Sequence, residues 1–292
     1  MTFSHVTHPM DLRRRFVFRG NAAAIGGRLV RPVDLMIESS VASSLTVVGG
    51  RSRAQARDIR FGDLISFSTA STLAEGVFDD LKQQIELTHH RVAEDSLKTS
   101  TRVNADVAGL NVGKTPKLTV KHLHASLTAK SPAGSGEPAI APGSDTTIDG
   151  AAVDGHGLVV ELAIPLFQKY DTRAKLLTAA DDPTFVRESG DYLFMKSPVG
   201  GKPAPPTGRL LHASGTTYAT IVKSIKWAGE PYPGATIDHH VVTVPNFGKI
   251  FFGELLITDL SRRLTMLRLE LGSPDGGAVA AAEVESNGTW SS

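Results

Sequence analysis

The sequence contains no cysteine, and this absence removes several classes of chemistry at once. Disulfide bonds, thiolate nucleophiles and cysteine-ligated zinc or iron–sulfur sites all require that residue. A chain of 292 residues can bury enough surface to fold without a covalent staple. Any bound metal ion would therefore be held by histidine and carboxylate side chains.

The sequence also lacks a long apolar run and an excess of charge of either sign. No stretch reaches the roughly 18 apolar residues of a bilayer-spanning helix, so we expect no transmembrane segment. The 31 basic and 30 acidic residues give a formal net charge of +1, which offers no electrostatic reason to expect nucleic acid as a partner. The composition is that of an ordinary globular protein, for which we expect a packed core.

The beginning of the chain loosely resembles an export signal. Residues 13–17 read Arg-Arg-Arg-Phe-Val, which is similar to a twin-arginine signal. Arg19 and Asn21 interrupt the apolar stretch that should follow, and Arg28 closes it. The compartment stays open: the lack of a convincing signal peptide favours the cytoplasm, and export is the alternative.

Short apolar runs rich in Val, Ile, Thr and Phe recur between clusters of Gly, Pro, Asn and Asp, a pattern typical of many strands joined by turns. Near the beginning of the chain, Phe16 to Phe18 and Ala24 to Ile25 predict strand edges joined through a turn at Gly20-Asn21. The small, polar tail after Gly276 predicts a frayed end.

The last third of the chain has the clearest strand pattern. Four runs, residues 221–227, 237–244, 251–257 and 267–271, predict a four-stranded antiparallel meander.

Two segments have helical spacing. Apolar residues from Phe78 to Val92 suit one helix. A second helix is predicted from Pro165 to Leu177, because proline fits the first turn and Pro183 stands beyond the end.

The predicted fold class is all-β, with antiparallel sheets in a β-sandwich or a barrel-like pair and one or two short helices. Residues 131–143 are rich in proline, glycine and small residues and predict a linker or a long loop. This segment would separate an N-terminal β domain, residues 1–130, from a C-terminal β domain, residues 144–292, unless the two form one continuous domain. A mainly α/β fold is the alternative, and irregular alternation of strands and helices disfavours it.

Residues 106–112, Asp-Val-Ala-Gly-Leu-Asn-Val, the strand to Ala129, and residues 143–153 together resemble segments of the bacterial choice-of-anchor P family. The resemblance is partial and includes no catalytic residues. It implies a β-rich, surface-associated protein of undefined activity.

Two segments resemble catalytic or phosphate-binding motifs, but each lacks a required feature. Residues 108–115 resemble a phosphate-binding P-loop, yet Ala108 replaces the first glycine, and Pro116 with a strand-like run follows where a helix is required. Residues 50–54, Gly-Arg-Ser-Arg-Ala, fall one residue short of a nucleophile elbow, and we expect a polar loop there.

Two pairs of polar side chains have the spacing of metal ligands. His122 and His124 share one face of a strand, and Asp238 and His240 form a similar pair on another strand. Three or four such ligands that converge would hold zinc, manganese or iron. The simpler interpretation places them on the outer faces of half-exposed strands. We therefore predict no cofactor, with a divalent metal at these four residues as the alternative.

Glu254 interrupts an otherwise apolar strand and is the candidate general base. An ion pair with Arg262, Arg263 or Arg268 is the simpler interpretation of this carboxylate.

The lack of a complete catalytic motif favours a non-enzymatic binding or structural protein, whose partner is itself or another protein. Unpaired strand edges promote self-assembly, so we expect a homo-oligomer. The second hypothesis is a metal-dependent enzyme that uses the His/Asp residues above with Glu254 as general base. A third is a β pore-forming protein, for which residues 66–71 and 99–104 are too short to supply the long hairpin.

Overall fold

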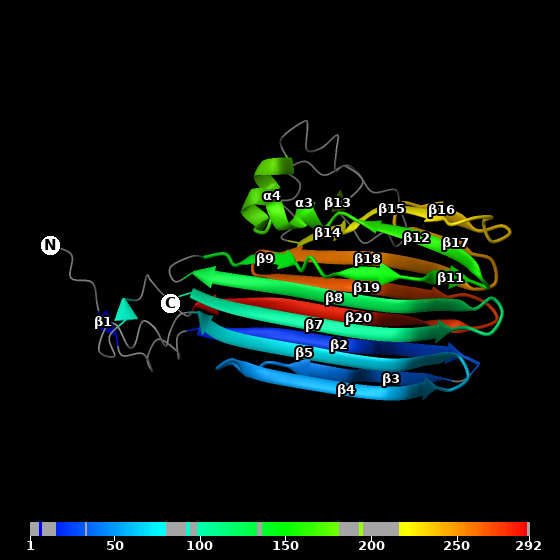
Figure 1. Ribbon diagram of the computed structural model, residues 1–292, viewed down its shortest axis with the longest axis horizontal. Helices are drawn as coiled ribbons and strands as arrows, with labels where there is room; N and C mark the ends of the chain where they lie inside the picture. The colour runs from blue at the N-terminus through cyan, green and yellow to red at the C-terminus, as the bar shows by residue number, and fades with distance from the viewer. Residues whose placement is uncertain are drawn as a thin grey trace.

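The computed structural model describes residues 6–7, 16–32, 34–79, 92–93, 98–132, 136–180, 193–194 and 216–290. These residues form two nine-stranded antiparallel sheets and two short helices, which confirms the all-β fold class. The strands of the two sheets run in nearly the same direction, one layer in front of the other (Figure 1). Among the described residues, no helix is long and apolar enough to cross a membrane.

The first layer, which we name sheet I, is continuous from β15 to β4. Its order is β15 (Val222–Trp227), β12 (His156–Leu162), β11 (Ala151–Val153), β8 (Leu118–Pro132), β7 (Lys98–Val112), β5 (Ile65–Asp79) and β4 (Gly50–Phe61), with β9 (Ala139–Pro142) and β10 (Thr147–Asp149) also paired to β8.

The second layer, sheet II, contains strands from both ends of the chain. Its order is β13 (Leu193–Phe194), β14 (Thr216–Thr220), β18 (Gly248–Thr258), β19 (Ser261–Leu271), β20 (Gly276–Trp290), β2 (Phe16–Arg31) and β3 (Leu35–Ser44), with β17 (Val241–Val244) beside β18 and β16 (Thr236–Asp238) beside β17. A separate pair joins β1 (Val6–Thr7) to β6 (Val92–Ala93). Both sheets combine strands from before residue 131 and after residue 143.

The hydrophobic core lies between the two sheets and forms one cluster of buried side chains. Sheet I contributes residues such as Phe67, Val103 and Leu123, and sheet II contributes residues such as Ile25 and Leu264. Alternation along each strand sends these apolar side chains inward and polar ones outward. The exposed side chains of both sheets are consequently mostly polar, with a few apolar exceptions such as Met36 and Val159.

A transverse row of kinked residues interrupts this alternation in sheet I. Asp58 in β4 and Gly109 in β7 have positive φ, 52° and 65°, and both stand opposite Ser68 of β5. Such a residue bends its strand and moves the following side chains to the other face.

Sheet II carries a matching row. Gly253 in β18, Ala282 in β20 and Val41 in β3 have φ of 58°, 52° and 52°, and the register places them in line across the intervening strands.

The kink in β20 shows what the row does to the core. Val279 and Ala281 are buried before the kink, and Ala282 and Val284 are buried after it, so the inward set shifts by one residue. Because both sheets shift, their inner faces stay apolar along the whole length of the strands.

The predicted helix at Pro165 is present, divided into α3 (Ile164–Lys169) and α4 (Arg173–Ala180). Arg262 of β19 is 2% exposed and donates a 2.6 Å hydrogen bond from Nη2 to the Tyr170 carbonyl at the end of α3. Burial lowers the pKa of Arg262 to about 10. Arg173 at the start of α4 forms a 2.6 Å ion pair with Asp259. These two arginines attach the helices to sheet II.

Several local predictions were wrong because the strands are longer than the runs that predict them. Gly20-Asn21 is not a turn but lies within the 16-residue strand β2. The tail after Gly276 is not frayed: it forms β20, in the interior of sheet II between β19 and β2. Residues 50–54 are not a loop but begin β4.

The strands of the predicted meander are divided between the two sheets. In the predicted meander, β15 pairs with β12 in sheet I, whereas β16 to β19 follow one another in sheet II. The helix predicted from Phe78 to Val92 does not start at Phe78, because β5 extends to Asp79, and residues 80–91 lie outside the described residues.

Gly109→Ala is expected to lower the free energy of unfolding by about 2–4 kcal/mol, from the strain of a left-handed L residue and from overpacking. The added Cβ would lie 2.3 Å from Ser68 Oγ. Gly62→Ala is the matched control, because Gly62 has φ of 56° with no atom near its Cβ position, and we expect roughly 1–2 kcal/mol. Urea denaturation measures both. Equal losses in the two variants would contradict tight packing at the kink row.

Candidate functional site

The outer face of sheet I carries a shallow polar groove over β4, β5, β7 and β8. It consists of two adjoining depressions of about 720 Å³ and about 420 Å³, which share Gln55, Ser71 and Asp106 in their linings. The first also touches Arg57 and His122. Hydroxyl, amide, carboxylate, imidazole and guanidinium groups therefore converge on one surface, and we take this groove as the candidate site.

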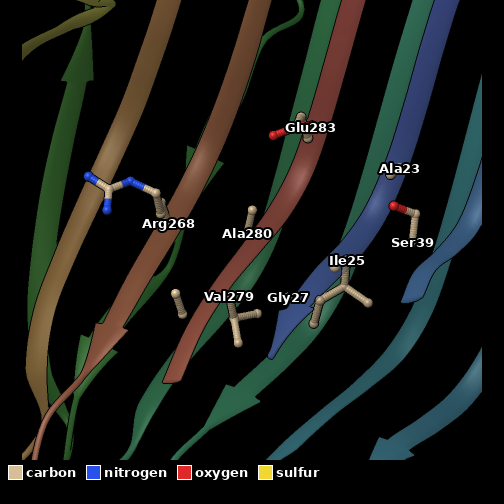
Figure 2. Close-up of a pocket in the computed structure, with 10 residues that line it drawn as sticks. Ala23, Ile25, Gly27, Ser39, Arg268, Val279, Ala280 and Glu283 are labelled. Carbon is tan, nitrogen blue, oxygen red and sulfur yellow. The ribbon is translucent and has the colours of Figure 1, made fainter. Parts of the chain in front are cut away.

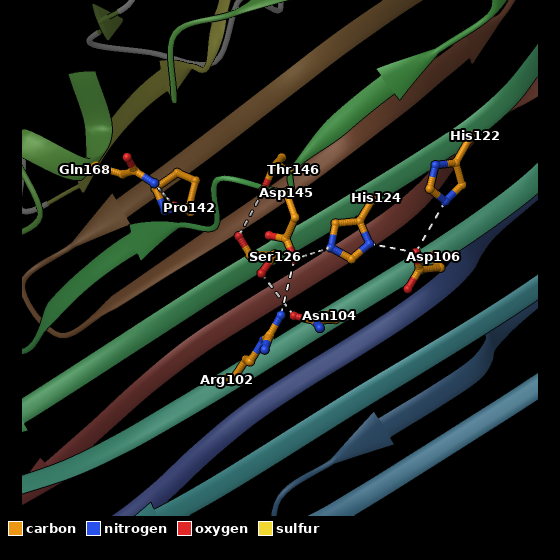
Figure 3. A network of polar contacts seen from close by, with 10 residues as sticks. All are labelled: Arg102, Asn104, Asp106, His122, His124, Ser126, Pro142, Asp145, Thr146 and Gln168. Carbon is orange, nitrogen blue, oxygen red and sulfur yellow. Dashed lines mark hydrogen bonds and ion pairs between the residues drawn. The ribbon is translucent and has the colours of Figure 1, made fainter. Parts of the chain in front are cut away.

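One wall of the groove contains Asp106 and His122, which belong to a network of acidic and imidazole groups on β7, on β8 and in the turn between β9 and β10 (Figure 3). Asp106 Oδ1 lies 2.6 Å from His124 Nδ1 and 3.3 Å from His122 Nε2. On its far side, His124 Nε2 lies 3.3 Å from Asp145 Oδ2, which Arg102 also contacts at 3.2 Å. Both ring nitrogens of His124 thus face carboxylate oxygens.

This arrangement favours the protonated form of His124. Its hydrogen bond to Asp106 raises the pKa of His124 above the usual 6.5, and burial opposes the rise. For Asp106, burial favours the neutral acid, but the hydrogen bonds and charges of His124 and His122 outweigh it and lower the pKa. At neutral pH the Asp106–His124 pair therefore tends toward a carboxylate–imidazolium pair.

The opposite wall of the groove is formed by arginines of β4. Arg53 and Arg57 are exposed and line the groove, one in each depression. Within the described part of the chain, neither has a carboxylate partner, and the same holds for Arg60 further along the strand. Arg51 contacts Glu75 at 3.7 Å. The groove thus contains cationic groups whose charge the described residues leave uncompensated.

The predicted metal ligands lie on different sheets. His122 and His124 lie together on β8 of sheet I, on one face as predicted, with ring centroids 6.3 Å apart. Asp238 ends β16 of sheet II and is exposed, whereas His240 follows it in the turn before β17 and is 2% exposed. Within the ranges the structure describes, no group of three or more His, Cys, Asp or Glu residues has the arrangement of a metal site. Metal ligation by these residues stays a prediction.

Glu254 belongs to an ion-pair cluster on the outer face of sheet II. Arg268 binds it through two contacts, 2.6 Å and 2.9 Å, and so is the partner among the three arginines considered. His240 Nε2 lies 3.7 Å from Glu254 Oε1. Burial raises the pKa of Glu254, but the hydrogen bonds with Arg268 and His240 outweigh it and lower the pKa overall. A carboxylate held this way is a weak base, and its role as general base stays a prediction.

A separate depression, of about 300 Å³, lies on the outer face of sheet II (Figure 2). Small residues of β2 and β20 form its floor, among them Gly27 and Ala280, and Arg268 and Ser39 stand on opposite sides of it. The Arg268 guanidinium is already paired with Glu254 and Glu270. This depression therefore offers few groups for recognition compared with the groove on sheet I.

Two parts of the groove escaped prediction from the sequence. Asp106 is 18 residues from His124, and the pairing of β7 with β8 brings the two side by side. Arg53 and Arg57 lie in a segment for which the sequence predicts a loop. The available signal of a strand was the alternation of long polar side chains at residues 51, 53, 55 and 57 with small ones between them.

The stability of the protein should fall as the pH rises above about 6.5 because of His124. A group whose pKa is raised by folding contributes stability that is complete below its unfolded pKa and is lost as pH rises through its folded pKa. His124→Asn should therefore flatten the decline in the free energy of unfolding as the pH rises above about 6.5. Urea denaturation at a series of pH values measures this.

His156→Asn is the matched control for this series, because His156 lies outside the network and contacts the Glu230 carbonyl instead. It should keep the pH dependence of the parent protein. If His124→Asn also kept it, the Asp106–His124 pair would not be the origin of the decline.

The chain matches one protein family among known proteins. No curated protein and no solved structure matches the chain. The resemblance to the choice-of-anchor P family, and the surface association that it implies, therefore stay predictions. Residues 16–199 and 202–258 match the model of a family described as a domain of unknown function, DUF8256. These residues make up most of the sequence, so the chain belongs to the DUF8256 family.

Proposed function

We propose that the protein is a non-enzymatic binding protein whose groove on the outer face of sheet I holds an acidic ligand. The observation that carries this proposal is the presence of Arg53 and Arg57 in the groove without a carboxylate partner among the described residues. A guanidinium group presents a planar set of donors that matches a carboxylate, sulfate or phosphate group.

The arginines of sheet II offer only part of this combination. There, Arg28 is paired with Asp34 at 2.6 Å, Arg263 with Glu285 at 3.2 Å, and Arg268 with Glu254. Arg19 and Arg31 have no carboxylate partner among the described residues either, but neither lines one of the depressions described above. Those of the groove instead stand over a floor that includes Thr69 and Ser71, where hydroxyl groups can bind a polar ligand.

The Asp106–His122–His124 network would give the groove its second recognition element. Asp106 accepts hydrogen bonds from a ligand's hydroxyl or amide groups, whereas His122, about two-fifths exposed, offers a donor beside it. Arginines on one wall and this network on the other would orient a ligand that has acidic groups along one side only.

Acidic polymers test the proposal directly. We expect poly-L-glutamate and dextran sulfate to bind at low ionic strength, neutral dextran not to bind, and salt to weaken binding. Arg53→Gln/Arg57→Gln should weaken poly-L-glutamate binding about tenfold or more, because charge-assisted hydrogen bonds are worth about 1.5–3 kcal/mol each. Isothermal titration calorimetry gives the dissociation constants.

The matched control is Arg19→Gln/Arg31→Gln, which removes the same charge from exposed positions of β2 in sheet II. Its affinity should stay within about twofold of the parent value, on the scale of a surface charge effect. Equal weakening in both double variants would reduce the effect to net charge and refute a specific site in the groove.

A further inference from the structure

The free edge of β4 is unusually long and open. β4 closes the order of sheet I, and among the described strands it pairs only with β5. None of its 12 residues is buried, whereas each of the other strands of ten or more residues contains buried positions. Natural sheets usually keep edge strands short or covered, because the unpaired backbone groups attract further strands. An edge of this length is therefore a candidate for strand addition.

The outward side chains of β4 restrict which strand can be added. Arg51, Arg53, Arg57 and Arg60 are all exposed. Pairing β4 with a second copy of itself would set arginines beside arginines, which is unfavourable for cross-strand neighbours. The kink at Asp58 further limits regular pairing to residues 50–57. The edge is thus protected against its own copies, so it does not support the homo-oligomer expected from the sequence, and it is complementary to acidic side chains.

The inward side chains of β4 supply the other half of the pattern. Ser52, Ala54 and Ala56 are small and half-buried, and beyond the kink Ile59 and Phe61 pack against the core while remaining partly exposed. An added strand beside residues 50–57 that turned apolar side chains inward would extend the core over Ser52, Ala54 and Ala56.

We propose that β4 is the docking edge for an extended polypeptide segment in which acidic and apolar residues alternate. This inference rests on the proposed function and names a ligand class for the same two arginines, with the ligand beside β4 at the edge of the sheet. The segment would add to sheet I beside residues 50–57, about 4.7–4.9 Å from β4, with its acidic side chains toward Arg53 and Arg57. Backbone hydrogen bonds would hold the strand, and the arginines would select it.

Three peptides of eight residues separate strand addition from simple charge attraction. The first, (Glu-Val)₄, has the proposed pattern; the second, Glu₄-Val₄, has the same composition in blocks; the third, (Lys-Val)₄, reverses the charge. All carry blocked ends, and all are tested against the full chain. We expect the first to bind at least about tenfold more tightly than the second, and the third not to bind.

Hydrogen exchange measured by mass spectrometry reports where the peptide lies. Binding of (Glu-Val)₄ should slow exchange of backbone amides in residues 50–57, because free edge groups become hydrogen-bonded. Residues 35–44, the edge strand β3 of sheet II, are the internal control and should not change. Dextran sulfate should bind without protecting residues 50–57.

The outcomes distinguish the two proposals. If (Glu-Val)₄ and Glu₄-Val₄ bind equally, through Arg53 and Arg57, and leave exchange of residues 50–57 unchanged, strand addition is overturned and acidic-ligand binding stands. If no acidic probe binds in a way that depends on these arginines, both proposals fail. Circular dichroism of Arg53→Gln/Arg57→Gln verifies that the variant is folded.

Discussion

The burial of two apolar sheet faces against each other is the constraint on which the rest of the structure depends. Each sheet must present apolar side chains inward along strands of up to 16 residues. Alternation alone would achieve this for straight strands, but both sheets are kinked in a row, at Gly109 in one and at Ala282 in the other. The rows shift the inward set by one residue in both layers, so the two faces stay complementary. Asp106 precedes the kink of β7 and lies on the outer face that bears the groove.

The sequence predicts the fold class because alternation and turn residues are local signals. It also predicts the helix at Pro165 and the common face of His122 and His124, which need only periods of 3.6 and 2. It does not predict β20, because a strand made largely of Gly, Ala and Ser has the composition of a flexible tail, and its stability comes from pairing with β19 and β2. Nor does it predict the kinks at Val41 and Ala282, since neither residue type favours positive φ.

The site was partly predictable, because some of its residues are marked by local sequence patterns. The two histidines follow from their spacing, but Asp106 enters the site through the register of β7 and β8, which the local sequence does not determine. The arginines of β4 were visible as an alternating series, yet Gly50 and the nearby serine favoured a loop. A tertiary partner, β5, makes that segment a strand. Local patterns therefore located the groups of the site, whereas strand pairing determined which of them meet.

Protection and recognition at β4 are two results of one charge pattern. A long open edge attracts any strand through its backbone, without regard to sequence. Arginines at residues 51, 53, 57 and 60 make the addition of like-charged strands unfavourable and the addition of acidic ones favourable, so specificity comes from repulsion as much as from attraction. An edge with apolar side chains in place of these arginines would have bound a wider range of strands, with less selectivity among them. The near-neutral whole chain strengthens this reasoning: with a net charge of +1, the stripe reflects the local arrangement of charge and not a general excess of basic residues.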